Sequence, residues 1–190
     1  MKKFVALFVV ILMALLLASC GTTYAQYATK GTVELGGSVS YSSTTAVSNG
    51  TTASESTSLF QFMPYASYFF LDSFSVALSP GINILSPAGA TDNTKIYGIF
   101  VVPGYTFNMK SNVFPFVEGL VGYTALKSGS TDNSGISFGG KGGIKVILGK
   151  NGAASFGLSY MLINLSPSGA SSRSGFNNFA FSVGYSVFLN

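Results

Sequence analysis

The feature that most constrains the fold is a two-residue alternation of bulky apolar and small side chains. In its clearest stretch, residues 74–84, the two sets are Phe74, Val76, Leu78, Ile82 and Ile84 against Ser75, Ala77, Ser79, Gly81 and Asn83. Because successive side chains of a β-strand point to opposite faces, this stretch predicts a strand with one apolar and one small polar face. The same alternation recurs over 33–41, 136–148, 156–162 and 179–189.

Three further stretches, 58–71, 95–109 and 113–127, are rich in aromatic and β-branched residues but are interrupted by Pro64, Pro103 and Pro115. Proline cannot donate to a strand ladder, which makes their pattern noisier. We interpret them as strands as well, which gives eight. The strands are long enough for the roughly 9 to 11 residues that a tilted membrane strand needs.

The predicted connections are of two kinds that alternate along the chain. Those after the first, third, fifth and seventh strands, 42–57, 86–94, 127–135 and 166–174, are long and rich in Ser, Thr, Asn and Gly. Those after the second, fourth and sixth, 72–73, 110–112 and 150–152, are short. This order is typical of outer-membrane barrels, with loops outside and turns in the periplasm. The sequence therefore predicts an all-β, eight-stranded antiparallel up-and-down transmembrane β-barrel.

Polarity favours the membrane barrel over a soluble one. Only 8% of the residues are charged, against about 25% in an average soluble protein. The polar face of the strands is mostly Gly, Ser, Ala and Asn, which suits a narrow lumen. Seven Phe side chains near the short turns predict an interfacial girdle of aromatic residues: Phe69, Phe70, Phe74, Phe107, Phe114, Phe116 and Phe188. A soluble periplasmic barrel that carries an apolar ligand remains an alternative.

The amino terminus has the order of a secretory signal. Lys2 and Lys3 precede an apolar run over 4–17 and a zone of small residues. Within that zone, Ala25 followed by Gln26 fits ordinary cleavage, whereas 17–20 fits lipoprotein processing with Cys20 acylated. We favour cleavage after Ala25, which makes 1–25 a signal peptide and 26–190 the barrel domain.

Several stretches resemble the bacterial outer-membrane β-barrel domain family. They are PYASYFFLDSFSVALSPGINI at 64–84, FPFVEGLVGY at 114–123, GGIKVILGKNGAASFGLSY at 142–160 and the final strand FAFSVGYSVFLN. The resemblance covers nearly the whole mature chain through loose patterns. It implies a small integral protein of the Gram-negative cell outer membrane that contacts outer-membrane lipids and the barrel assembly machinery. The last residue is usually aromatic in that family, whereas this chain ends with Asn190.

Four charged residues fall on the polar face of the predicted strands: Glu34, Glu118, Lys141 and Lys145. An eight-stranded barrel has an interior that side chains fill, so these charges are expected inside it. Counting from the predicted loop 127–135 places Glu118 opposite Lys145, with Lys141 nearer the outside. Because an unpaired buried charge is costly, we expect a lumenal ion-pair cluster.

The composition removes several classes of chemistry. The chain has no histidine and one cysteine, which excludes a histidine-based metal site or general base. Residues 26–190 carry eight basic and six acidic side chains, too small a bias to indicate nucleic acid. We expect no enzyme activity, cofactor or metal; a histidine-free lipid-modifying enzyme is the alternative. The Ser/Thr-rich stretch 44–57 is the candidate contact for a ligand outside the cell.

Overall fold

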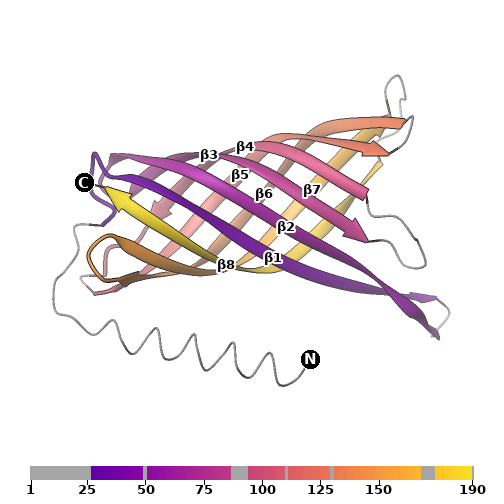
Figure 1. Cartoon of the computed structure of the whole chain (residues 1–190), viewed down its shortest axis with the longest axis horizontal. Helices are drawn as coiled ribbons and strands as arrows, with labels where there is room; N and C mark the ends of the chain where they lie inside the picture. Colours follow the sequence, from indigo (N-terminus) through magenta and orange to yellow (C-terminus); the bar gives the residue numbers. More distant parts are fainter. Residues whose placement is uncertain are drawn as a thin grey trace.

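In the computed structural model, eight strands close into one barrel in chain order, every neighbouring pair is antiparallel, and β8 pairs back with β1 (Figure 1). The structure describes residues 27–48, 51–86, 94–109, 111–128, 131–167 and 174–189. The strands are β1 (Val33–Ser48), β2 (Thr51–Leu71), β3 (Phe74–Ser86), β4 (Thr94–Thr106), β5 (Val113–Ser128), β6 (Thr131–Leu148), β7 (Gly152–Pro167) and β8 (Ser174–Leu189). The predicted eight-stranded antiparallel up-and-down barrel is confirmed.

The two-residue alternation sets the inside and the outside of the barrel. In β3, Phe74, Val76 and Leu78 are exposed, whereas Ala77 and Ser79 on the alternate positions are buried. Every strand contributes bulky apolar side chains that are at least 40% exposed, for example Leu35, Phe62, Leu78, Ile99, Val121, Phe138, Leu158 and Phe181. The apolar face of the alternation thus points outward on every strand. Among the described residues, no helix is long and apolar enough to cross a membrane.

The three prolines lie inside strands rather than between them. In the pairing of β2 with β3, the register passes from Phe62↔Ile82 to Ala66↔Leu78 across Pro64. In the pairing of β4 with β5, it passes from Val101↔Val121 to Gly104↔Glu118 across Pro103. A proline removes a donor from the ladder without ending the extended backbone, so each strand continues.

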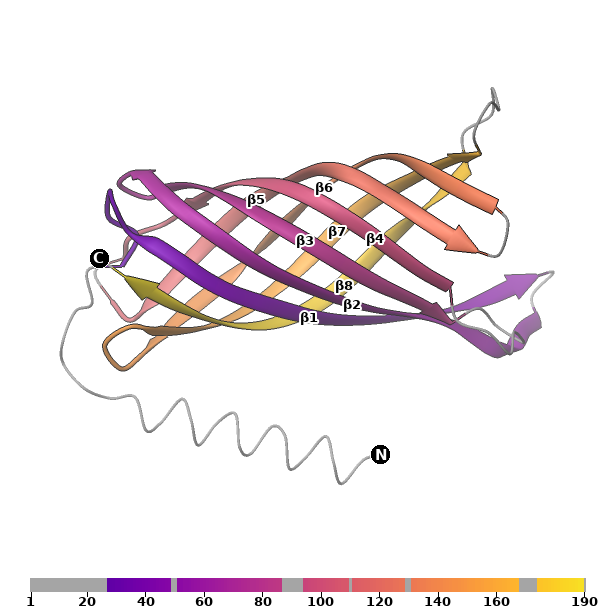
Figure 2. The ribbon, with the colours of Figure 1, turned by 45° about the horizontal axis from the view of Figure 1, so that its top comes forward.

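Two of the predicted long loops are mostly strand. In the predicted loop 42–57, β1 continues to Ser48 and β2 begins at Thr51, so this hairpin extends beyond the rest of the barrel (Figure 2). In the predicted loop 127–135, Ser128 already pairs with Thr131. The prediction of loops there was wrong because Ser and Thr were counted as loop residues, whereas Thr and Val favour extended backbone. Short connections follow β2, β4 and β6 as predicted, although β4 ends at Thr106, before the predicted turn at 110–112, and β7 already begins at Gly152.

Those turns define the short-turn end of the barrel, and a segment before β1 closes this end. Tyr27 and Ala28 are each 1% exposed. The backbone N–H of Ser73 donates to the carbonyl of Ala28 at 2.8 Å, and that of Gly31 donates to the carbonyl of Phe69 at 2.8 Å. Gly31 has a φ of 95°, a left-handed conformation that glycine adopts without strain. Residues 27–32 therefore form a plug, which the sequence did not predict.

The predicted girdle of Phe residues is wrong for four of its seven members. Phe69, Phe114, Phe116 and Phe188 are buried inside the barrel, whereas Phe70, Phe74 and Phe107 are exposed. The rings of Phe69, Phe114 and Phe188 surround Tyr27 with ring centroids 4.9–5.7 Å apart. Position near a turn was the basis of the prediction, but the alternation decides which face a side chain occupies.

Candidate functional site in the barrel lumen

Side chains in the lumen are stacked in layers from the short-turn end toward the loops. The first layer is the apolar cluster around the plug: Tyr27, Ala28, Phe69, Phe114, Ile147, Ala153 and Phe188. The second contains the four predicted charged residues. The third is a second apolar cluster: Met63, Ala77, Ile96, Phe100, Val102, Leu120, Met161 and Ile163. The charged residues therefore lie between two apolar layers.

Glu34 is the centre of the charged layer. It is fully buried, and its carboxylate accepts two hydrogen bonds from Lys145 Nζ, at 3.1 Å to Oε1 and 2.9 Å to Oε2. Three hydroxyls also donate to it: Tyr27 at 2.9 Å, Tyr65 at 2.8 Å and Ser186 at 2.7 Å. A buried carboxylate is stable only when such partners replace its hydration. The buried charge of Glu34 is thus fully compensated.

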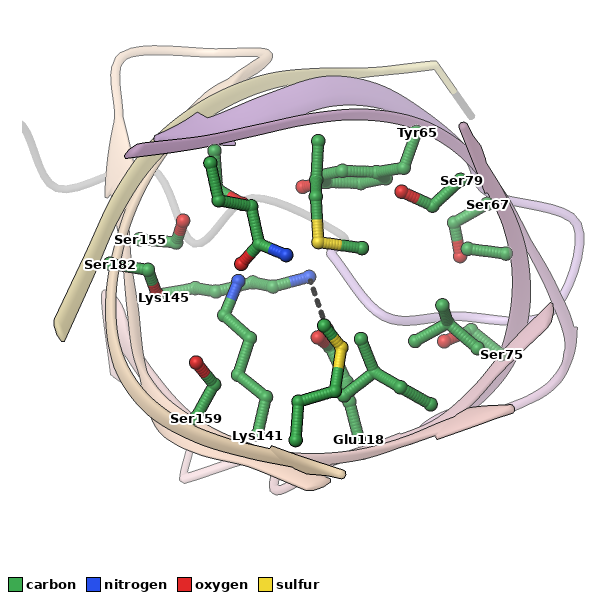
Figure 3. A pocket seen from close by; sticks show the side chains of 17 residues that line it. Tyr65, Ser67, Ser75, Ser79, Glu118, Lys141, Lys145, Ser155, Ser159 and Ser182 are labelled. Carbon is green, nitrogen blue, oxygen red and sulfur yellow. Dashed lines mark ion pairs between the residues drawn. The ribbon is translucent and has the colours of Figure 1, made fainter. Parts of the chain in front are cut away.

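Lys145 connects Glu34 to the second carboxylate. Its Nζ lies 3.8 Å from Glu118 Oε1, and it lies over the rings of Tyr27, Tyr65 and Phe116 with 5.4–5.8 Å to the ring centroids. Figure 3 shows the ammonium near the barrel axis with the ion pair to Glu118. Aromatic faces stabilise a cation when water is excluded. The structure therefore brings Glu34, Glu118 and Lys145 together.

The register of β5 and β6 differs from the predicted one, although Lys141 does lie nearer the loop end than Lys145, as predicted. Glu118 is opposite Lys141 in the register, and Lys145 is opposite Phe114. The predicted position of Lys145 directly opposite Glu118 was wrong because the hairpin tip was placed in the middle of 127–135, whereas β5 and β6 extend to Ser128 and Thr131. The two side chains nevertheless form an ion pair. Lys141 lies over the ring of Phe116, 5.6 Å from its centroid.

A small cavity adjoins the charged layer. It has a volume of about 50 Å³, and Glu118, Lys141 and Lys145 line it together with several serines from β2, β3, β7 and β8 (Figure 3). A cavity of this size holds only a few water molecules. Next to it, Phe100 fills a cradle of glycines: a Cβ on Gly98 would lie 2.7 Å from the Phe100 ring, and one on Gly122 2.5 Å from it. The absence of side chains at these positions lets the ring occupy the lumen.

Toward the loops the lumen is polar. The hydroxyls of Thr124 and Ser137 hydrogen-bond to each other at 2.8 Å, and Ser40 donates to Gln61 Oε1 at 3.1 Å. Asn83 is fully buried, yet neither of its side-chain polar atoms has a hydrogen-bond partner among the residues the structure describes. Polar groups at this end are thus less completely paired than those around Glu34.

Sequence reasoning missed three of the groups that hold Glu34. Tyr65 and Ser186 lie on the inward face of their strands, and the alternation could have identified them. Tyr27 precedes the first strand and carries no such signal. The predicted cleavage site at Ala25 and Gln26, and Cys20, lie outside the described residues. In the described part of the chain, no three His, Cys, Asp or Glu side chains are grouped so that they could hold a metal ion.

No protein-family model matches the chain, and no curated protein matches its sequence. Solved structures do match. Neisserial surface protein A has a TM-score of 0.62 at 16% identity, over 83% of this chain and 97% of that one. OprG of Pseudomonas aeruginosa has a TM-score of 0.55 at 17% identity, over 87% and 99%. The N-terminal β-barrel domain of P. aeruginosa OprF has a TM-score of 0.50 at 12% identity, over 84% and 98%. At these identities the likeness establishes the fold: the chain has the fold of small eight-stranded outer-membrane barrels.

Proposed function

We propose that this protein is an integral β-barrel of the Gram-negative outer membrane, with a lumen closed to solutes and a structural or surface-interaction role. The single observation that carries the proposal is the exposed apolar surface, to which every strand contributes. A water-soluble protein rarely exposes an apolar patch larger than a few hundred Å². An acyl-chain environment removes this surface from water, and a soluble carrier of an apolar ligand would leave it uncovered.

The closed lumen is supported by what fills it. The plug residues Tyr27 and Ala28, the ion pairs of Lys145 and the ring of Phe100 occupy successive levels of the interior. The cavity between them has about 50 Å³, and an eight-stranded barrel is in general just wide enough to be filled by side chains. We expect no steady conductance when the purified protein is added to a planar lipid bilayer, and a stable ion current would contradict this part of the proposal.

The extended β1–β2 hairpin supports the surface role. Among the described residues it reaches furthest beyond the loop end, and its backbone is paired through Ser48↔Thr51 (Figure 2). Because its backbone is already paired, such a hairpin could contact partners outside the cell at a low cost in ordering. We propose no enzymatic reaction: the charged groups of the lumen lie between two apolar layers and point into the barrel, away from lipid.

Membrane integration has a direct test in the full-length protein. An intact barrel resists detergent, so the band of an unheated sample should migrate differently from that of a boiled sample. Washing membranes with alkaline buffer should leave the protein in the outer-membrane fraction. Release by buffer alone, without a heat-dependent band, would contradict the proposal and favour the soluble carrier.

A further inference from the structure

One hollow of the outer surface lies across the seam where β8 closes on β1. A groove of about 650 Å³ lies there, and its lining includes Gly37, Phe62, Pro64, Leu148, Ala154 and Tyr185. Its volume falls within the roughly 300–1,000 Å³ typical of ligand pockets. The groove is distinct from the lumenal site because these side chains belong to the outward face of their strands.

The groove exists because two outward positions in one cross-strand row are small. The register joins Pro64, Gly37, Tyr185 and Ala154 in a single row across β2, β1, β8 and β7. Gly37 has no side chain and Ala154 only a methyl group. Tyr185 does not fill the row, because its hydroxyl oxygen lies so close to Gly152 that a Cβ there would be 2.6 Å from it. The Tyr185 ring leans toward the short-turn end and leaves the row open.

The groove has a polar end and an apolar end. Leu148 is the last residue of β6, and the exposed Lys150 follows it in the turn 149–151, so this end lies at the rim of the barrel. The Tyr185 hydroxyl lies on the same side, beside Gly152. At the other end are Phe62 and Pro64, well inside β2. None of the described residues that line the groove is acidic.

We propose that this groove binds one acyl chain of an anionic phospholipid, with the headgroup phosphate next to Lys150 and the chain directed along Ala154 and Gly37 toward Phe62. The proposal rests on the proposed membrane function, because short turns face the periplasm and place Lys150 at the phospholipid leaflet. The groove runs from Lys150 and the Tyr185 hydroxyl to the apolar side chain of Phe62, as a phospholipid runs from its polar headgroup to its apolar chain. Lys150 supplies the charge that favours an anionic headgroup over a neutral one.

Native mass spectrometry of the full-length protein in mild detergent tests the proposal, with dioleoylphosphatidylglycerol as the anionic probe and dioleoylphosphatidylcholine as the neutral one. We expect one phosphatidylglycerol to remain bound per wild-type barrel and phosphatidylcholine to bind several-fold more weakly. Ala154→Phe should fill the groove and reduce retention at least tenfold. Lys150→Gln should remove the preference for the anionic probe but keep binding of the chain.

The matched control is Ala125→Phe, which adds the same ring at an outward position of β5, opposite the exposed Tyr97 and away from the groove. It should retain phosphatidylglycerol as the wild type does. Equal retention by Ala154→Phe and wild type would overturn the proposal, as would a wild-type dimer that Ala154→Phe converts to monomer, because a second copy would then occupy the groove. A heat-modifiable wild-type barrel that retains no lipid refutes this inference alone, whereas a protein extracted by buffer refutes the membrane function itself.

Discussion

The lumen and the outer surface of this barrel are built from the same strands but carry different side chains: the lumen contains paired charged groups, and the outer surface is apolar. Inside, the charged groups lie between two apolar clusters, and the charge of Glu34 is matched by five hydrogen bonds. Outside, bulky apolar side chains such as Leu78 and Val121 stand about half exposed. The difference shows that the apolar surface is directed at the barrel's surroundings, while buried polar groups must find partners within the lumen.

The largest loss of stability is expected at Glu34, the charged residue of the lumen with the most hydrogen bonds. Replacing Glu34 by Ala leaves Lys145 buried without the carboxylate at 2.9 Å, and we expect a loss of about 3–5 kcal/mol in the free energy of unfolding. Urea unfolding in detergent micelles, followed by circular dichroism, measures it. The control is Glu118→Ala, because Glu118 lies 3.8 Å from Lys145 and its side chain is 21% exposed; it should cost about 1 kcal/mol. Equal losses for the two variants would contradict the central position of Glu34.

A charged residue on the outer surface should cost more stability near the middle of the membrane than near its edge. Val101 is half exposed near the middle of β4, and Val101→Lys should cost about 2–4 kcal/mol in lipid vesicles. Val113, the first residue of β5 beside a short turn, serves as the comparison, and Val113→Lys should cost about 0–1 kcal/mol. Refolding titrations into vesicles would give both values. If the two lysines cost the same, the surface does not cross a lipid core.

A smaller effect is expected at the plug. Tyr27→Phe keeps the ring among Phe69, Phe114 and Phe188 but removes the hydroxyl that donates to Glu34 at 2.9 Å. Loss of a hydrogen bond to a charged group should cost about 1.5–3 kcal/mol. The same urea titration measures it, and Tyr68→Phe on the outer surface is the control because Tyr68 is 50% exposed. An unchanged stability in Tyr27→Phe would place the segment 27–32 outside the folded barrel.

The smallest effect is expected where a polar group inside lacks partners. Asn83 makes no side-chain hydrogen bond within the described residues, so Asn83→Leu, which replaces polar atoms by apolar ones of similar size, should change stability by less than about 1 kcal/mol. Thr124→Val, which leaves the Ser137 hydroxyl without its 2.8 Å partner, should cost about 1–3 kcal/mol. Thermal unfolding in detergent compares the two. A large loss in Asn83→Leu would reveal a partner such as bound water.

The sequence predicted the strands and their faces because both depend on local alternation. In residues 74–84, the side chains that face outward and inward are those that the two-residue alternation predicts. Prediction from the sequence failed where the structure depends on contacts between segments that are distant in the chain. The plug around Tyr27 forms only once β2, β5 and β8 bring Phe69, Phe114 and Phe188 together.

The candidate site in the lumen could also be predicted only in part. The inward position of Glu34, Glu118, Lys141 and Lys145 follows from alternation, but which of them pair depends on register. Register is set by where a hairpin turns, and a Ser/Thr-rich tip gives no sharp signal. Hence the partnership of Glu34 with Lys145, from strands that are not neighbours, could not be obtained by counting along the chain.

The most direct test of the central claim uses the absence of tryptophan from the sequence. Single-tryptophan variants Leu78→Trp, Val121→Trp and Leu158→Trp place one fluorophore on the outer surface of three strands, and Phe100→Trp places one in the lumen. In vesicles that contain lipids with brominated acyl chains, we predict strong quenching of the three outer tryptophans and little quenching of the lumenal one. Equal quenching at all four positions, or none at the outer three, would contradict a barrel whose apolar surface faces lipid.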